Sequence, residues 1–367
     1  MPGTCVDYTH AIYPSNSIDI RRHLAAGARR LQGKIKALQL PDESISPFIR
    51  AYFRSNIDHF QAAMQRYSFL LSWALRSRRA EGLEDVVLVD YGGGSGVLSL
   101  LAREIGIGTV IYVDIYDVCC RDAQSIGRRL NLEADHYVHA DTEELVAYLR
   151  KKELVCNTVM SYDALEHIYD IDHFFHHLQG ITQGPLTLTL ASGANPLNPI
   201  INRRLMRLHR KVETQGTLRR AGDDERNPEI PLVALRESIV VEHITGMDRQ
   251  VVNLLARRTR GRNKSDILRA VSVYREQGVL PVEIEHPTNT CDPYTDNWCE
   301  RLLDPCRLGE ELRQLGFRVD VFPGYYGSVM QDSAGKRWMR DVANFLISGS
   351  ARMGLRLAPY YCINAVR

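Results

Sequence analysis

The sequence predicts an α/β fold in which a seven-stranded sheet carries helices on both faces. From residue 86 onward, short β-branched runs alternate with stretches long enough for crossover helices, the pattern of βαβ units. A glycine cluster follows the first run, and the alternation returns near the C-terminus. The predicted strands are Val86–Asp90, Val110–Asp114, His136–Ala140, Val155–Ser161, Leu186–Ala191, Phe317–Phe322 and Tyr360–Val366.

The overall composition is that of an ordinary soluble globular protein. Of 367 residues, 44% are hydrophobic and 25% are charged. A net charge of +2 demands neither nucleic acid nor an anionic membrane as partner. No secretory signal and no apolar run near the roughly 18 residues of a membrane span are found. Eight cysteines without a CxxC pair argue against a zinc site or a disulfide framework, so we expect a cytoplasmic protein with reduced thiols, no metal and no membrane partner.

Four segments are expected along the chain. Residues 1–85 form an N-terminal helical cap, and residues 86–196 form a Rossmann-like core. Residues 197–299 are rich in arginine and are interpreted as a mainly helical insertion that could form a lid over the substrate. Residues 300–367 return to the core sheet with its last strands.

Two long helices are expected outside the regular alternation. One starts at the Ser46–Pro47 pair, a favourable cap and first turn, and runs from Phe48 to about Arg79. The other fills Gly335 to Leu355. Both are predicted as continuous helices.

The strongest local signal is a glycine-rich turn between a strand and an amphipathic helix. The strand ends at Asp90, and Gly92, Gly93, Gly94 and Gly96 follow. Glycine accepts positive φ and close approach of a ligand, and the next helix offers free N–H groups. The plainer interpretation is a tight turn. The turn does not match the dinucleotide-binding fingerprint, whose third position would be Gly or Ala but is Val97 in one register and Ser99 in the other. It is not a phosphate-binding P-loop either, because no Gly-Lys-Ser/Thr sequence follows.

The spacing Asp90-x-Gly92-x-Gly94-x-Gly96 resembles the glycine-rich motif of class I S-adenosylmethionine-dependent methyltransferases. The resemblance implies that Asp90 and the three glycines line the cofactor S-adenosylmethionine. It also implies that Asp114, at the next strand end, binds the ribose hydroxyls, that Asp141 meets the adenine amino group, and that Asp163 lies beside the cofactor. For a lone aspartate the commoner role is a helix N-cap.

The stretch SYDALEHIYD after the fourth strand resembles the "LEH" segment of small-molecule methyltransferases of the ubiquinone-pathway O-methyltransferase type. The resemblance covers about residues 86–195, with weaker matches at 300–322. It implies transfer of a methyl group to oxygen, nitrogen or carbon of a small or medium-sized metabolite. It identifies no particular acceptor.

Three residues after the fourth strand are candidates for catalysis. His167 has the intrinsic pKa of a base near neutrality, and Glu166 and Tyr162 lie beside it in the chain. The alternative is that Glu166 and His167 brace the following helix. Asp163, Glu166 and His167 also loosely resemble the metal-binding cluster of small-RNA 2′-O-methyltransferases. That pattern starts with Glu and needs a further histidine that the spacing does not select, so no metal is predicted.

Candidate substrate residues come from two places. Asn195 follows the fifth strand, although Asn-Pro is also a common turn former. Tyr52 and His59 could roof the site, or serve as core and surface of the helical cap. The arginines of the insertion suit an anionic substrate or a solvated helix face.

Two further functions stay open from the sequence. The basic insertion could serve an RNA or protein methyltransferase, although nucleic acid is not the favoured partner. An NAD(P)-dependent reductase is disfavoured by Val97 and Ser99. The oligomeric state is not predicted.

Overall fold

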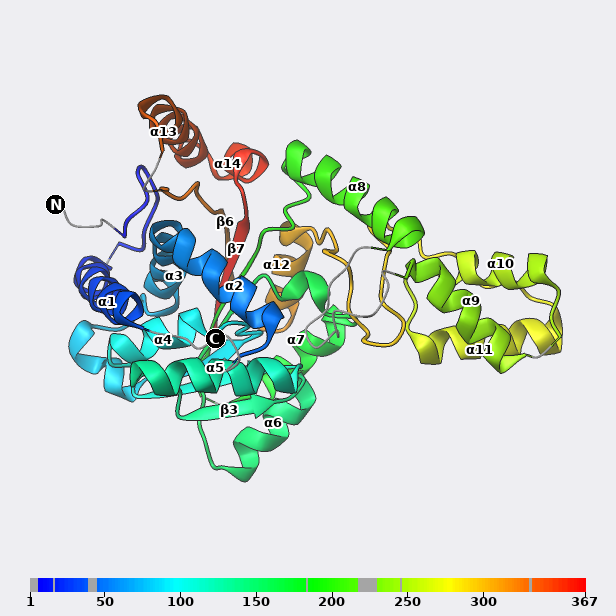
Figure 1. The fold of residues 1–367 in the computed structure, drawn as a ribbon. Coiled ribbons are helices and arrows are strands. Elements are labelled where there is room, and N and C mark those ends of the chain that lie inside the picture. Colours follow the sequence, from blue (N-terminus) through cyan, green and yellow to red (C-terminus); the bar gives the residue numbers. More distant parts are fainter. Residues whose placement is uncertain are drawn as a thin grey trace. The chain divides into compact units, whose positions relative to one another are not determined.

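The computed structural model describes residues 6–15, 17–38, 45–182, 184–216, 230–244, 246–329 and 332–367. The chain divides into two compact units. The first contains residues 1–165, 172–198 and 304–367, and the second contains residues 166–171 and 199–303. Figure 1 shows the elements of both units, which are described separately below.

The first unit is built on one seven-stranded sheet in the order β3-β2-β1-β4-β5-β7-β6. All neighbouring pairs are parallel except the pairs of β7 with β5 and with β6, which are antiparallel. The strands are β1 Val87–Tyr91, β2 Thr109–Asp114, β3 His136–His139, β4 Thr158–Tyr162, β5 Thr187–Ser192, β6 Arg318–Pro323 and β7 Tyr361–Val366. This arrangement confirms the predicted Rossmann-like α/β fold with seven strands.

The strand order reverses between β1 and β4, because β2 and β3 lie on one side of β1 and the later strands on the other. In open α/β sheets, ligands bind outside the carboxyl ends of the strands at such a switch point. The glycine-rich turn follows β1 directly and therefore lies at this position.

The central strands are buried along their length, as a sheet covered on both faces requires. All six residues of β5 and the last four of β1 are buried. The strand predicted from Val155 begins only at Thr158, because the Val155 side chain is 66% exposed and belongs to the loop.

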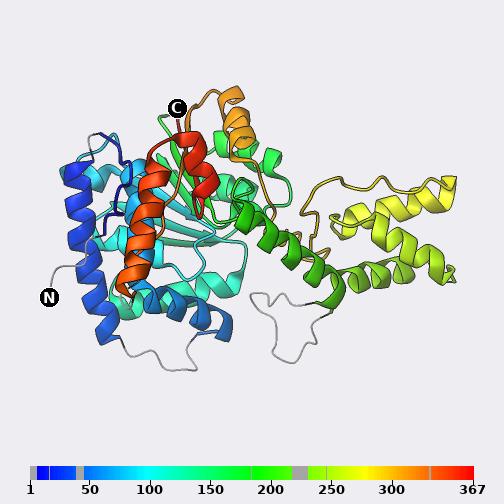
Figure 2. The ribbon, with the colours of Figure 1, turned by 90° about the horizontal axis from the view of Figure 1, so that it is seen from above.

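Helices lie on either side of the sheet, as Figure 2 shows. Among them, α4 packs on β2, α5 on β2 and β3, and α12 on β6 and β7. Their bounds are α4 Val97–Glu104, α5 Asp117–Leu130, α6 Thr142–Lys151, α7 Ile171–Gln179 and α12 Pro305–Gln314. Short 3₁₀ turns span Ala80–Asp85 and Leu165–His167.

The N-terminal helices are α1 Ile18–Ala37, α2 Pro47–Asp58 and α3 Phe60–Ala74. The Ser46 side chain accepts a hydrogen bond from the Ile49 N–H, and Pro47 opens α2. The expectation of one helix from Phe48 to Arg79 is wrong, since the helix breaks at His59. Neither glycine nor proline stands there. The break comes from packing, because α3 is buried on most sides against β4 and β5, whereas α2 buries one narrow stripe.

The connection between β6 and β7 contains α13 Ala334–Ser348 and α14 Ala351–Leu357. The single helix expected from Gly335 to Leu355 is therefore wrong at its middle. Ser350 adopts an extended conformation, and the chain turns there so that α13 and α14 pack against each other.

The second unit is mainly helical, with α8 Pro199–Gln215, α9 Leu232–His243, α10 Arg249–Arg258 and α11 Lys264–Gln277. An apolar core joins the last three helices and contains Ile239, Val240, Val252, Leu255, Ile267 and Val271. Residues 278–303 carry no helix or strand beyond one isolated bridge between Cys291 and Trp298.

Two further observations concern the residues that the structure describes. Within the described ranges, no helix combines the length and the apolar character that crossing a bilayer requires. The seven cysteines that the structure describes are free thiols.

Candidate cofactor site

The turn after β1 is held in place by the neighbouring strand. The N–H groups of Gly92 and Gly93 both donate to the Val113 carbonyl of β2, at 2.9 and 3.1 Å. Gly92, Gly94 and Gly96 have φ angles of +70°, +52° and +74°. Side chains with a Cβ rarely adopt this left-handed conformation, so the turn depends on glycine at these positions.

Close neighbours also exclude side chains from the turn. A Cβ built on Gly92 would lie 2.5 Å from the Ala164 Cβ, and one on Gly93 would lie 2.4 Å from the Tyr112 ring. A Cβ on Gly94 would lie 2.7 Å from the ring of Tyr52, so Tyr52 lies against this glycine. The turn therefore presents backbone at close range.

The Asp90 carboxylate is buried and faces the helix after the turn. Its Oδ2 accepts hydrogen bonds from the Ser99 N–H at 3.1 Å and from the Ser99 hydroxyl at 2.7 Å. Burial raises the pKa of Asp90 to about 6. Asp90 thus joins β1 to α4 and supports the turn, and its contact with the cofactor remains a prediction.

Asp114 ends β2 with its carboxylate directed at the turn. Its Oδ2 accepts from the Gly94 N–H at 3.1 Å, and its Oδ1 accepts from the Tyr116 N–H at 3.0 Å. The carboxylate is buried, and burial raises its pKa. Tyr112 donates to the Gly94 carbonyl at 2.7 Å and braces the same turn. Asp114 and the glycines therefore form one site.

Asp141 caps α6. The Glu144 N–H donates to its Oδ1 at 2.9 Å, and the Glu144 carboxylate accepts from the Asp141 N–H at 3.0 Å. This reciprocal capping box is the role that the sequence offered as the alternative to adenine binding. The adenine contact remains a prediction.

Tyr162 and Asp163 lie at the carboxyl end of β4. Asp163 has a φ of +55°, and its Oδ1 accepts from the Gly193 N–H at 2.7 Å, which joins the ends of β4 and β5. The Tyr162 hydroxyl accepts from the Arg66 Nη1 at 2.6 Å. Burial is the main cause that raises the pKa of Tyr162 well above 10, and the negative charge of Asp163 is the second. The catalytic role of Tyr162 remains a prediction.

Arg66 is the residue of this region that sequence reasoning missed. It stands on α3, and its guanidinium lies 4.4 Å from the centre of the Tyr162 ring. Its Nε is shielded from solvent and has no hydrogen-bond partner among the described residues. The sequence feature that could have pointed to Arg66 is that it is the one charged residue of the helix FQAAMQRYSFLLSWA.

The substrate candidates are divided by the structure. Tyr52 lies against Gly94 and is 39% exposed. His59 is exposed at the end of α2, and its Nδ1 lies 3.1 Å from the Ser55 carbonyl. Asn195 is fully buried, and its amide nitrogen donates to the carbonyls of Leu355 and Ala358 at 2.8 and 3.0 Å. Because both N–H bonds are used inside the fold, we assign Asn195 a structural role.

Glu166 and His167 belong to the second unit. The His167 Nδ1 lies 2.8 Å from the Trp298 carbonyl, and the Trp298 N–H donates to the His167 carbonyl at 3.2 Å. Two groups of side chains have potential metal-ligating atoms within 4.8 Å of one another. One group is Glu166, His167 and Glu300, and the other, on the first unit, is Glu143, His173 and His177. The catalytic roles of Glu166 and His167 remain predictions.

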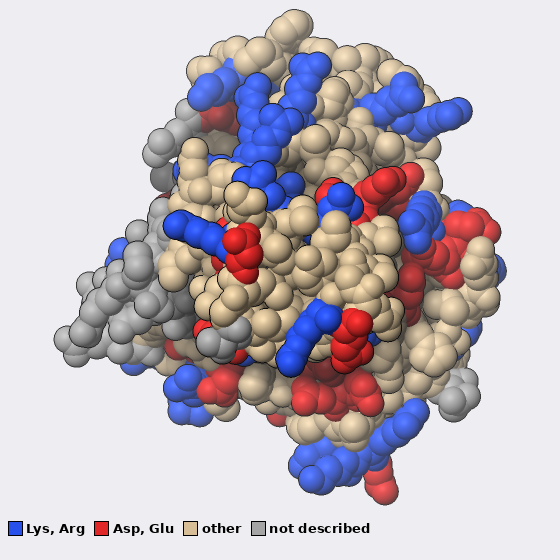
Figure 3. Space-filling model, turned by 90° about the vertical axis from the view of Figure 1, so that its right-hand side faces the viewer, with Lys and Arg blue, Asp and Glu red and all other residues tan. Residues whose placement is uncertain are grey.

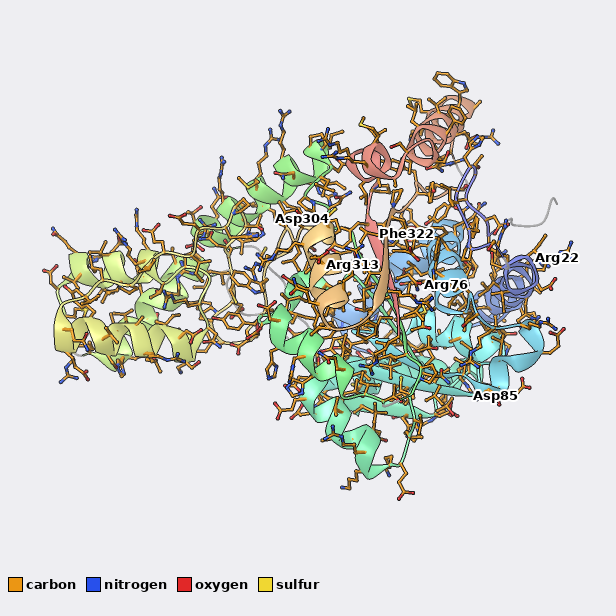
Figure 4. All side chains as sticks on the ribbon, turned by 180° about the vertical axis from the view of Figure 1, so that it is seen from behind. Arg22, Arg76, Asp85, Asp304, Arg313 and Phe322 are labelled. Atoms are coloured by element: carbon orange, nitrogen blue, oxygen red, sulfur yellow. The ribbon has the colours of Figure 1, made fainter. Side chains whose placement is uncertain are left out.

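A cavity of about 720 Å³ lies elsewhere in the first unit, on the outer side of β6. Its lining includes Arg76 and Phe322, both labelled in Figure 4, together with Trp73, Tyr13 and Tyr325. Arg76 forms an ion pair with Asp320 at 2.7 Å. None of the predicted site residues lines this cavity.

Comparison with known proteins gives structural similarities alone. No protein-family model matches the chain, and no curated protein matches it. The plantazolicin methyltransferase BpumL in complex with SAH is similar over 94% of this chain and 98% of its own, with 9% identity and a TM-score of 0.38. A SAM-dependent methyltransferase from Archaeoglobus fulgidus (86% and 99% coverage, 12% identity, TM-score 0.38) and one from Mesorhizobium loti (77% and 91%, 12%, 0.35) are also similar. At these values the fold assignment rests on the strand order of this chain itself.

Proposed function

We propose that the first unit binds S-adenosylmethionine and that the protein transfers its methyl group to a small or medium-sized acceptor. The observation that carries the proposal is the turn after β1, where left-handed glycines at the switch point of the sheet meet the Asp114 carboxylate. A carboxylate at the end of β2 suits two neighbouring ribose hydroxyls. The cofactor supplies the electrophilic methyl group, and the protein binds the cofactor and the acceptor and aligns them for transfer.

The geometry favours this nucleoside over a nicotinamide dinucleotide. In the dinucleotide fingerprint, the third small residue allows the helix to approach the strand closely. Here Val97 and Ser99 occupy those places, and Ser99 uses its hydroxyl and N–H to hold Asp90.

The first test removes the Asp114 carboxylate. We expect Asp114→Ala to weaken binding of S-adenosylhomocysteine by about 1.5–3 kcal/mol, because hydrogen bonds to a charged group are lost. Calorimetry measures the effect. Asp117→Ala, an exposed acid at the start of α5, is the matched control and should bind normally. Wild-type affinity in Asp114→Ala would refute the ribose assignment.

We further assign Arg66 to the carboxylate of the methionyl part of the cofactor. This end of the nucleoside is a zwitterion and needs a cation beside it. Arg66 is held by Tyr162 at the end of β4, and its Nε has no protein partner in the described structure. Guanidinium groups pair well with carboxylates because they offer several N–H donors in a fixed plane.

The Arg66 assignment makes a selective prediction. We expect Arg66→Met to weaken S-adenosylhomocysteine by about 10- to 150-fold, which corresponds to 1.5–3 kcal/mol. The same variant should bind 5′-methylthioadenosine, which lacks the carboxylate, as the wild type does. Arg76→Met, which removes a surface ion pair of the same unit, is the control. Equal losses for both nucleosides would indicate a general packing effect instead.

His167 remains our candidate base for a hydroxyl or protonated amine acceptor, with Glu166 beside it in the chain. The single hydrogen bond described for the His167 ring involves Nδ1 and the Trp298 carbonyl. If Nδ1 carries the proton, Nε2 is the basic nitrogen. This arrangement supports the proposal and leaves the acceptor open.

An RNA or protein methyltransferase is the second candidate, and one observation favours it. Arg203, Arg204, Arg207, Arg210 and Lys211 are all exposed on α8. On the face drawn in Figure 3, however, basic side chains are interspersed with acidic and uncharged ones. An anionic group on a small acceptor suits the same arginines. Steep loss of acceptor binding with salt would indicate nucleic acid.

A further inference from the structure

The outer surface of α13 and α14 is unusually apolar for a protein surface. Trp338, Met339, Phe345 and Leu346 on α13 are 67%, 58%, 61% and 53% exposed, and Met353 on α14 is 51% exposed. Single exposed apolar residues are common, but a contiguous group of large ones marks an interaction surface. We call residues 338, 339, 342, 345, 346, 353 and 357 the apolar surface of α13–α14.

The periodicity of α13 puts its exposed apolar residues on one side. At about 100° per residue, positions 338, 339, 342, 345 and 346 fall within an arc of roughly 120°. The opposite side carries Asn344 and Ile347, which are buried. Asn344 exchanges hydrogen bonds with the backbone of Tyr326 at 2.9 and 3.1 Å. These contacts fix the rotation of α13, so the apolar arc faces outward.

Positive charge accompanies this surface. Residues 334–357 contain five lysines and arginines and one aspartate, a net charge of +4. Arg340 is paired with Asp332 at 2.7 Å. The other four, Lys336, Arg337, Arg352 and Arg356, are exposed and form no ion pair with a described residue. An unpaired cluster of exposed cations attracts anionic surfaces more strongly than neutral ones.

Although the net charge of the whole chain predicts no membrane partner, the local charge and apolar surface differ, and we propose that α13 and α14 form a docking surface for an anionic lipid interface. A helix with Trp, Phe and Leu on one side and Lys and Arg beside them lies in the plane of the headgroups without crossing the bilayer. A second copy of the chain is disfavoured, because two surfaces with the same excess of positive charge would face each other. The surface is separate from the cofactor site, so this inference stands independently of the proposed reaction.

The surface is connected to the ligand edge of the sheet. Tyr361 at the start of β7 is paired both with Pro323 at the end of β6 and with Ser192 at the end of β5. The α13–α14 connection therefore leaves and re-enters the sheet at the edge where β1, β4 and β5 end.

The experiment is vesicle flotation with the full-length protein. We expect it to float with vesicles of equal parts phosphatidylserine and phosphatidylcholine, to float far less with phosphatidylcholine alone, and to be released by salt. Arg352→Gln/Arg356→Gln should lower the partition coefficient about 30-fold, since each cation near such a surface contributes about 1 kcal/mol. Trp338→Ser/Phe345→Ser should abolish flotation.

Matched variants control for charge and apolar area. Arg22→Gln/Arg29→Gln removes two exposed cations from α1, and Val155→Ser removes an exposed apolar side chain of the same unit. Both should float as the wild type does. The proposal is overturned if no anionic vesicle binds the protein, or if the α13–α14 variants bind like these controls. It is also overturned if the protein is a dimer that Trp338→Ser/Phe345→Ser converts to monomer, because the surface would then join two copies.

Discussion

Replacing Arg236 by Met is expected to destabilise the second unit by about 3 kcal/mol. Arg236 is completely buried on α9, where it donates to the Ala256 carbonyl of α10 at 2.7 Å and pairs closely with Glu213 of α8. Removing one partner of a buried ion pair leaves an uncompensated charge, which costs about 3–5 kcal/mol. The lower end applies because Arg260 still lies 3.6 Å from Glu213.

Chemical denaturation measures this effect, followed by tryptophan fluorescence in a Trp73→Phe/Trp338→Phe background that leaves Trp298 of the second unit as the emitter. Arg258→Met, which removes a surface pair with Glu283, should change the free energy of unfolding by less than about 1 kcal/mol. Arg236→Met combined with Glu213→Leu should regain part of the loss, since the buried Glu213 carboxylate no longer lacks Arg236, although Arg260 then loses its contact with Glu213. A single Arg236→Met variant as stable as Arg258→Met would show that the pair contributes no more than a surface contact.

The second large effect is expected at the cofactor turn. Gly92→Ala places a Cβ 2.5 Å from the Ala164 Cβ and forces alanine to a φ of +70°. Left-handed strain costs about 1–2 kcal/mol, and overpacking against a neighbour that cannot rotate away costs about 1–3 kcal/mol. The turn will relax to another shape, and affinity for S-adenosylhomocysteine should fall by about 2–5 kcal/mol.

Gly106→Ala separates these causes. Gly106 has a φ of +82°, but no atom lies within 4 Å of its Cβ position. This variant should lose stability from strain alone and keep its affinity for S-adenosylhomocysteine. If Gly92→Ala bound as tightly as Gly106→Ala, the turn would not contact the cofactor.

The fold was predictable because its signals are local. A buried parallel strand needs a short β-branched run, and a left-handed turn needs glycine, so β1, the turn and α4 are visible in consecutive residues. The breaks within the long helices were not predicted. No glycine or proline marks the end of α2, and Gly349 after α13 does not by itself decide that the helix ends there, because both ends depend on what the neighbouring elements bury.

Of the candidate site, only the residues directly after the strands could be predicted from the sequence. Asp114 and the glycines come together because parallel strands bring their carboxyl ends to one edge. Arg66 and Tyr162 are 96 residues apart, and their hydrogen bond depends on how α3 packs across the sheet. Asn195 lies in the loop after β5, and its two hydrogen bonds to residues about 160 positions away could not be read from the sequence.

The sequence by itself determined the strands, the fold class and the turn, because each depends on short-range periodicity and on the conformational freedom of glycine. Tertiary structure alone decided which cation faces the end of β4, which polar side chains form hydrogen bonds inside the fold, and which side of α13 is exposed. Those outcomes depend on the burial of side chains that lie far apart in the chain, and a linear pattern carries no record of such distances.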